Sequence, residues 1–132
     1  MKAIFLSFVL LFVLGVVTPI AAQKTTSLNL GISNEKKVTN DKLKIKFVAV
    51  TEDSRCPAGV SCIWAGNAKV QIKITNRKGK SQTFELNTNL APQTVKFEGY
   101  EIKIAELTPT PQKDKPTAPK SYALNLIVTK AK

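Results

Sequence analysis

The chain has 132 residues, a formal charge of +11 from 20 Lys and Arg against 9 Asp and Glu, no histidine and two cysteines. This length is typical of a single domain. Because histidine is missing, the chain lacks the commonest general base and the commonest zinc ligand, and Ser-His-Asp and Cys-His nucleophilic sites are excluded. A large part of enzyme chemistry is therefore excluded from the start.

The beginning of the chain has the pattern of an export signal. Lys2 is a short basic start, an apolar stretch runs from Ala3 to Val17, and small residues precede the expected cleavage point at Gln23. The alternative is an uncleaved anchor, because the apolar segment is just long enough to span a bilayer. We predict a signal peptide over residues 1–22 and a single secreted or periplasmic domain over residues 23–132, with no stable membrane span after cleavage.

Polar and apolar residues alternate along most of the remaining chain, which predicts strands with one face in a core. The expected strands are 27–32, 42–50, 69–74, 83–86, 94–97, 100–104 and 122–129. The segment Asn76 to Lys80 predicts a hairpin turn with Gly79 at a positive φ. Seven short strands in about 110 residues predict an all-β fold, a small antiparallel β-sandwich or barrel.

Both cysteines lie in one dense motif, Thr51–Ala68, which also holds the only tryptophan. In an exported protein, Cys56 and Cys62 are expected to form a disulfide, and closing a ring of about seven residues stabilises by roughly 2–3 kcal/mol in the loop-entropy model. A redox or metal site is the alternative, although the C-x5-C spacing is not that of thiol oxidoreductases and two thiolates form a poor zinc site. We expect no cofactor and no metal.

This motif reads Asp-Ser-Arg-Cys-Pro at 53–57 and Cys-Ile-Trp-Ala-Gly at 62–66. It resembles a family of uncharacterised bacterial secreted and envelope proteins, which carry similar sequences between two β-strands. The resemblance continues through 100–111, with its Leu-Thr-Pro-x-Pro ending, and into the Tyr-Ala-Leu strand that begins at Tyr122. It implies a β fold and an exported location, but no activity and no site.

Two interpretations of Trp64 are open. In the one we favour, the indole packs over the disulfide and closes one end of the sandwich, where its burial contributes a few kcal/mol. In the other, the indole is a rigid aromatic platform for a sugar ring or a peptide. Exposure of the side chain distinguishes the two.

Asp53 and Arg55 are two residues apart, so in an extended segment their side chains face the same side. We expect Arg55 to brace the loop through hydrogen bonds to a carboxylate or to carbonyl groups; the alternative is that it holds an anion.

The segment from Thr108 to Lys120 contains four prolines, including Pro109 and Pro111. Prolines lack the N–H that sheet pairing needs, so this segment is predicted to be an extended, stiff loop. We favour a rigid connector between two strands; a partner-binding element is the alternative. The candidate binding residues are Trp64, Arg55, Asp53, Pro109 and Pro111.

The charge is carried mostly by lysine, since only two of the 20 basic residues are arginine. Lysines at alternating positions indicate a solvated sheet face, or attraction to an anionic envelope component. Nucleic acid is not expected as a partner, because arginine is scarce and few aromatic residues interleave with the charge.

These observations predict a non-enzymatic binding module in the periplasm or at the cell surface. Its partner is expected to be an anionic envelope component or another secreted protein. Two alternatives remain: a protease-inhibitor-like secreted domain, and a hydrolase that uses lysine or a metal in place of histidine.

Overall fold

The structure is a computed structural model of the whole chain, and it describes residues 15–17, 19, 24–40 and 42–131. Most of the predicted signal peptide over residues 1–22 therefore lies outside the described residues, and its cleavage stays a prediction. Within the part that is described, no helix is both long enough and apolar enough to cross a membrane.

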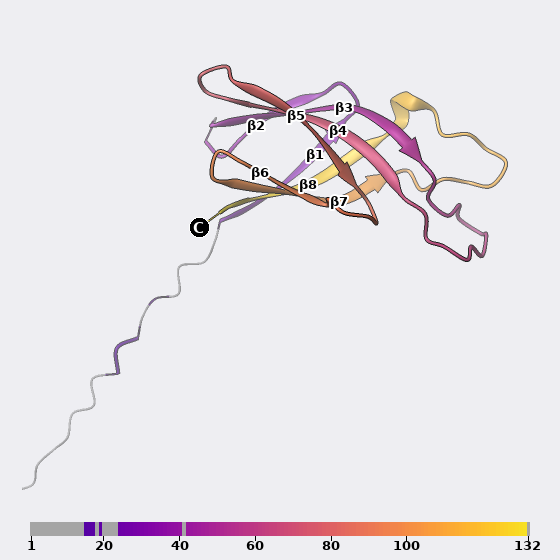
Figure 1. Cartoon of the computed structure of the whole chain (residues 1–132), viewed down its shortest axis with the longest axis horizontal. Coiled ribbons are helices and arrows are strands. Elements are labelled where there is room, and N and C mark those ends of the chain that lie inside the picture. Colours follow the sequence, from indigo (N-terminus) through magenta and orange to yellow (C-terminus); the bar gives the residue numbers. More distant parts are fainter. Residues whose placement is uncertain (1–14, 18, 20–23, 41, 132) are drawn as a thin grey trace, which may run out of the picture.

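The described residues form eight strands in two four-stranded antiparallel sheets (Figure 1). The strands are β1 (Thr25–Gly31), β2 (Glu35–Val38), β3 (Leu43–Asp53), β4 (Ala68–Asn76), β5 (Ser81–Asn87), β6 (Thr94–Phe97), β7 (Tyr100–Thr108) and β8 (Ala123–Lys130). One sheet has the order β1-β8-β7-β6 and the other the order β2-β3-β4-β5. The prediction of an antiparallel all-β fold is confirmed, as a two-sheet sandwich with no closed barrel.

The core lies between the two sheets and follows from the alternation in the sequence. In β4, for example, Val70, Ile72 and Ile74 are fully buried, while the residues between them face solvent or the rim. The same pattern places Phe47 from β3 and Leu126 from β8 in the core. Every buried core residue that the structure describes lies between positions 28 and 128, and the strands that carry them run from Thr25 to Lys130.

The strands differ from those expected in number and length. The short edge strand β2 was not predicted, because Val38 is the only apolar residue among its four and alternation cannot be read from one residue. Strand β3 reaches Asp53, three residues into the cysteine motif, and its pairing with β4 is interrupted by two irregularities.

The two ends of the sandwich are built differently, and we name them for what they carry. The turn end has short connections, at 39–42, 77–80 and 98–99. Gly79 there has a φ of +85°, which confirms the predicted hairpin turn. The loop end carries the disulfide loop, 54–67, and the Pro-rich loop, 109–122. In Figure 1 the loop end is on the right, and the C-terminus lies at the turn end on the left.

Candidate functional site

The disulfide loop begins as a continuation of the hairpin formed by β3 and β4. The amide of Ser54 donates to the carbonyl of Asn67 (2.7 Å), and the amide of Cys56 donates to the carbonyl of Ala65 (3.0 Å). Gly66 has a φ of +70°, and a Cβ at this position would collide with the carbonyl oxygen of Ser54. Only glycine fits this close approach of the two backbone segments.

Cys56 and Cys62 are joined by a disulfide, with their Cα atoms 5.9 Å apart, which confirms the predicted pairing. The ring between them is attached to the Pro-rich loop, since the amide of Ala58 donates to the carbonyl of Pro111 (2.8 Å). Ala58 also forms an isolated parallel bridge with Gln112. The tip of the disulfide loop is thus held both by a covalent bond and by its neighbouring loop.

Arg55 braces the base of the disulfide loop, as predicted. Its Nε and Nη2 atoms donate to the two carboxylate oxygens of Asp53, each at 2.8 Å. The same guanidinium donates across the molecule to the carbonyls of Leu107 (2.6 Å) and Pro109 (2.9 Å). These bonds link the sheet that contains β3 to the sheet that contains β7. Because its guanidinium makes these four hydrogen bonds to other residues of the chain, Arg55 is not placed to hold an external anion.

Asp53 is the centre of this brace, because it also accepts a hydrogen bond from the hydroxyl of Tyr122 (2.9 Å). The side chains of Asp53 and Arg55 are each 12% exposed. Burial alone would raise the pKa of Asp53, but the hydrogen bonds from Arg55 and Tyr122 outweigh it and hold that pKa below its ordinary value. Burial, together with the hydrogen bond to Asp53, raises the pKa of Tyr122. We call Asp53, Arg55 and Tyr122 the brace.

A second group of buried polar contacts was not predicted from the sequence. Asn67 and Asn87 are 5% and 4% exposed, and the side-chain amide of Asn67 donates to Asn87 (2.8 Å). The side-chain oxygen of Asn67 accepts from the amides of Asn89 (3.0 Å) and Leu90 (3.3 Å). The Asn-Thr-Asn sequence at 87–89, at the end of a strand, is the signal that points to such a turn, because asparagine side chains bond nearby backbone groups.

The expectation that Trp64 is buried is wrong. Its side chain is 82% exposed, and that of the preceding Ile63 is 92% exposed. Both residues lie on the part of the disulfide loop beyond the ends of β3 and β4. The indole instead lines an open hollow of about 470 Å³, together with Leu90, which is 58% exposed.

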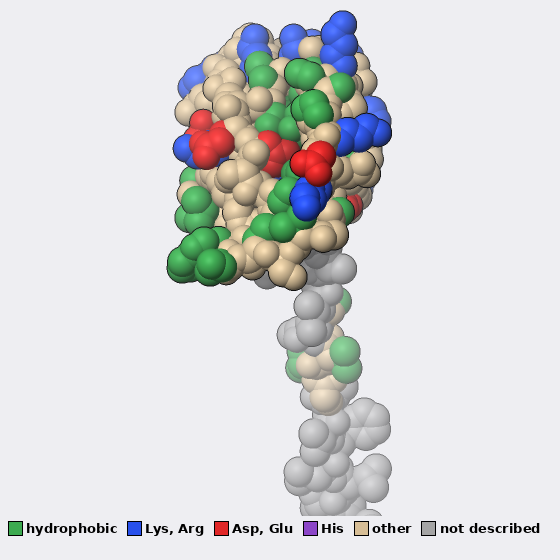
Figure 2. Space-filling view, turned by 90° about the vertical axis from the view of Figure 1, so that its right-hand side faces the viewer, with side chains coloured by type: hydrophobic (Ala, Val, Ile, Leu, Met, Phe, Trp, Pro, Cys, Tyr) green, Lys and Arg blue, Asp and Glu red, His purple; other side chains and the backbone are tan. Residues whose placement is uncertain are grey.

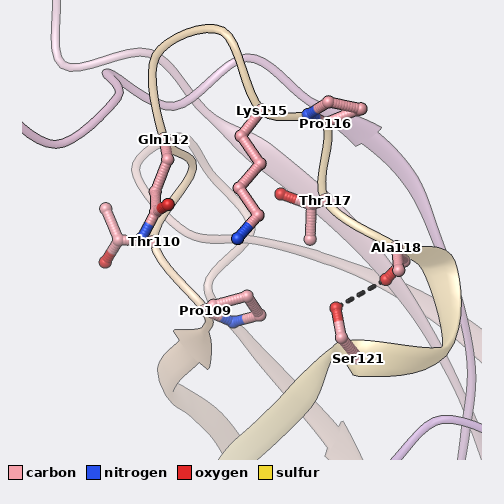
Figure 3. Close-up of a pocket in the computed structure, with 8 residues that line it drawn as sticks. All are labelled: Pro109, Thr110, Gln112, Lys115, Pro116, Thr117, Ala118 and Ser121. Atoms are coloured by element: carbon pink, nitrogen blue, oxygen red, sulfur yellow. Dashed lines mark hydrogen bonds between the residues drawn. The ribbon is translucent and has the colours of Figure 1, made fainter.

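The Pro-rich loop forms no regular strand, as its prolines predict, but it is not extended throughout: it contains isolated bridges, one of them between Gln112 and Lys115, and one three-residue 3-10 helix, Pro119–Ser121. It surrounds a hollow of about 320 Å³. Figure 3 shows that Lys115 extends across the inside of this loop toward Pro109. The carbonyl of Pro109 accepts a hydrogen bond from Arg55, and that of Pro111 accepts one from the amide of Ala58. These two prolines therefore bind the disulfide loop.

The five candidate binding residues are therefore gathered at the loop end, but in two different roles. Asp53, Arg55, Pro109 and Pro111 contribute to holding the loops, and Trp64 projects from them. The exposed apolar side chains form what we call the loop-end surface, which consists of Val60, Ile63, Trp64 and Leu90. Figure 2 faces the loop end, and hydrophobic side chains occupy its centre and lower edge, whereas most lysines and arginines lie toward the margins.

Scans of protein-family models, of curated proteins and of solved structures found no match to this chain. The resemblance to bacterial envelope proteins therefore stays a prediction. Among the described residues, no three His, Cys, Asp or Glu side chains are grouped as a metal site would require.

Proposed function

We propose that this protein is an exported, non-enzymatic binding module that contacts another secreted or envelope protein through the loop-end surface. The observation that carries the proposal is the exposure of Ile63 and Trp64, two adjacent large apolar side chains, on a loop that is otherwise held in place. A lone exposed apolar residue is unremarkable, but a group of them on one end of a domain is typical of an interaction site.

The held conformation of the loop supports this function. A loop that is already ordered loses little conformational entropy when it binds, so more of the contact energy appears as affinity. The disulfide, the bond between Ala58 and Pro111, and the brace all restrict the loop before any partner arrives. The sandwich supplies a rigid base for these contacts.

The composition of the loop-end surface favours a protein partner over a sugar. Tryptophan is enriched among the residues that dominate protein interfaces, where it is surrounded by apolar side chains that exclude water. Ile63 and Leu90 provide such aliphatic surroundings for Trp64. A sugar ring stacked on the indole would leave the two aliphatic side chains in water.

The test is affinity capture from envelope and secreted fractions with the immobilised domain, followed by measurement of affinity for the captured protein. Changing Ile63→Ala and Trp64→Ala together is expected to weaken that affinity by a factor of about 30 or more, the size of a hot-spot loss. The matched control is Lys78→Ala with Lys80→Ala, an exposed pair at the turn end. Equal affinities of the two variants, or no specifically retained protein, would contradict the proposal.

A protease-inhibitor-like role is the second candidate, and one observation favours it. The ring closed by Cys56 and Cys62 is constrained and projects from a rigid scaffold, as loops that occupy protease clefts do. Sub-micromolar inhibition of a secreted protease, lost when Val60 in the ring is changed to aspartate, is the expected result. A protease panel without inhibition removes this candidate.

Export is part of the proposal and has its own test. The pattern of residues 1–22 and the disulfide both favour an oxidising compartment. The mature protein recovered from the producing cell is expected to begin at Gln23 and to resist alkylation without reductant. A mass that includes residues 1–22, or two alkylated thiols, would contradict export with cleavage.

A further inference from the structure

The turn end carries three adjoining hollows, of about 550, 370 and 420 Å³. They share lining residues: Lys37 lies between the first and second, Arg77 between the second and third, and Lys42 between the first and third. The three hollows therefore form one continuous surface, which we call the turn-end surface.

Cationic side chains dominate this surface. Eight of them line the hollows: Lys24, Lys37, Lys42, Lys44, Arg77, Lys78, Lys80 and Lys130. Among the described lining residues the only acid is Glu98, and Asp41 lies outside the described residues. So many like charges within one end of a small domain create a strong positive potential.

The strand pairing does not account for this arrangement. Lys37 and Lys44 are directly opposite each other on β2 and β3, and Lys44 is 3.6 Å from Glu35. Like charges in opposite positions destabilise a sheet, whereas opposite charges stabilise it. Opposite charges do face each other elsewhere in this sheet, where Glu35 is opposite Lys46 and Glu52 is opposite Lys69. The pairing of Lys37 with Lys44 is therefore unfavourable, and an anionic ligand would offset its cost.

Chain geometry indicates which anionic ligand. Strand β1 begins at the turn end, and the apolar stretch of the sequence ends at Val17, eight residues before Thr25. An extended chain advances at most about 3.5 Å per residue, so this stretch stays within about 30 Å of the turn-end surface. Until the predicted signal peptide is cleaved, the turn end is the end of the domain that is joined to the apolar stretch expected to lie in the membrane.

We propose that the turn-end surface binds an anionic phospholipid membrane, with the domain standing end-on and the loop end directed away from the lipid. Flexible lysine side chains suit a fluid surface of phosphate groups, where no fixed bidentate geometry is required. Each cation near such a surface contributes separately, and the contribution is screened by salt. The proposal shares with the proposed function only the prediction of export; it uses the opposite end of the sandwich, so loss of vesicle binding and loss of partner binding at the loop end are separate outcomes.

The experiment uses the domain from Gln23 to the end of the chain, since every strand and every core residue lies within it. Its binding is measured to vesicles of phosphatidylcholine alone and of phosphatidylcholine mixed with phosphatidylglycerol. The test variant changes four lysines of the turn-end surface to glutamine, and the control variant removes the same charge from four exposed lysines elsewhere. The test set is Lys37, Lys42, Lys78 and Lys80; the control set is Lys96, Lys103, Lys113 and Lys120.

Binding is expected only to the vesicles with phosphatidylglycerol, weakening as salt is raised. The test variant is expected to bind at least about 100-fold more weakly than the control variant. Absence of binding to these vesicles overturns the proposal, and so does equal weakening of both variants, which would indicate net charge alone. Tight binding to a soluble acidic polysaccharide without vesicle binding also overturns it, and would assign the surface to a polysaccharide.

Fluorescence of Trp64, the only tryptophan, reports the orientation. Because Trp64 lies at the opposite end and is exposed, end-on binding leaves its emission maximum unchanged when vesicles are added. A shift to shorter wavelength means that the loop end enters the lipid, which overturns the proposed orientation.

Discussion

The two ends of the sandwich are formed by the same strands but differ in their connections and in the side chains that they expose. At the loop end, hydrogen bonds from Arg55 to Pro109 and from Ala58 to Pro111 fix two long loops against each other, and the apolar residues Ile63 and Trp64 are left in solvent. At the turn end, the connections are short and exposed lysines surround open hollows. The loop-end surface therefore depends on a fixed loop conformation. The turn-end surface depends on positive charge, which flexible lysine side chains can present in many conformations.

The largest expected effect compares two glycines that both have positive φ angles. Gly66→Ala at the loop end adds a collision with the carbonyl of Ser54, whereas Gly79→Ala at the turn end meets open space. The left-handed backbone alone costs about 1 kcal/mol, and the collision adds about 2 kcal/mol more. Urea unfolding should show a loss of about 3 kcal/mol for the first variant and about 1 kcal/mol for the second. Equal losses would mean that the loop end is not tightly packed.

The next comparison uses the two arginines of the chain. Arg55→Met leaves the carboxylate of Asp53 without its main partner, which costs about 3 kcal/mol for a pair that is mostly buried. Arg77→Met, at the turn end, changes an exposed residue that donates to the carbonyl of Asn40, and should cost less than about 1 kcal/mol. Chemical denaturation of both variants measures the difference. A loss at Arg77 as large as that at Arg55 would contradict the contrast between the ends.

A smaller effect is expected from the disulfide. Changing Cys56 and Cys62 together to serine should lower the free energy of unfolding by about 2 kcal/mol, because the ring that restricts the unfolded chain is short. Hydrogen exchange sharpens the comparison: amides of the disulfide loop, 54–67, should exchange faster, and those at 77–80 should be unchanged. Faster exchange at both ends would show that the ends are coupled.

The smallest effect is a pH dependence at the brace. The folded-state pKa of Asp53 lies below its ordinary value of 3.8, so its stabilisation is complete above the unfolded-state pKa and is lost as the pH falls through the folded-state pKa. One proton limits this slope to about 1.4 kcal/mol per pH unit. Denaturation between neutral and strongly acidic pH should show a steeper loss for the native protein than for Asp53→Asn. Parallel curves would place the acid sensitivity elsewhere.

The sandwich could be predicted because its strands depend on a simple pattern. Alternation identified the segments that became β3, β4 and β8, since each has several apolar residues on its inner face. Strand β2 was missed because its pairing with β3, rather than apolar residues of its own, holds it in the sheet. The pairing of Cys56 with Cys62 and the bonds from Arg55 to Asp53 were also predictable, because both join residues close together in sequence, whereas the bonds from Arg55 to Leu107 and Pro109 were not.

The parts of the site that could not be predicted depend on distant residues. Tyr122 meets Asp53 across 69 positions of sequence, and Asn67 meets Asn87 across 20. Nothing in the local pattern places these side chains together. Burial of Trp64 was expected because tryptophan side chains are usually buried. On a loop that projects beyond both sheets, the indole is exposed instead.

The ring between Cys56 and Cys62 has a consequence for how such a protein diversifies. Residues 57–61 place no side chain in the core, and their contact with Pro111 is made by the backbone of Ala58. Except at Gly59, whose φ of +78° disfavours other residues, their side chains can therefore be exchanged without loss of the sandwich. The ring is a natural position for grafting foreign peptides, and a lineage can acquire new binding preferences there while its scaffold is inherited unchanged.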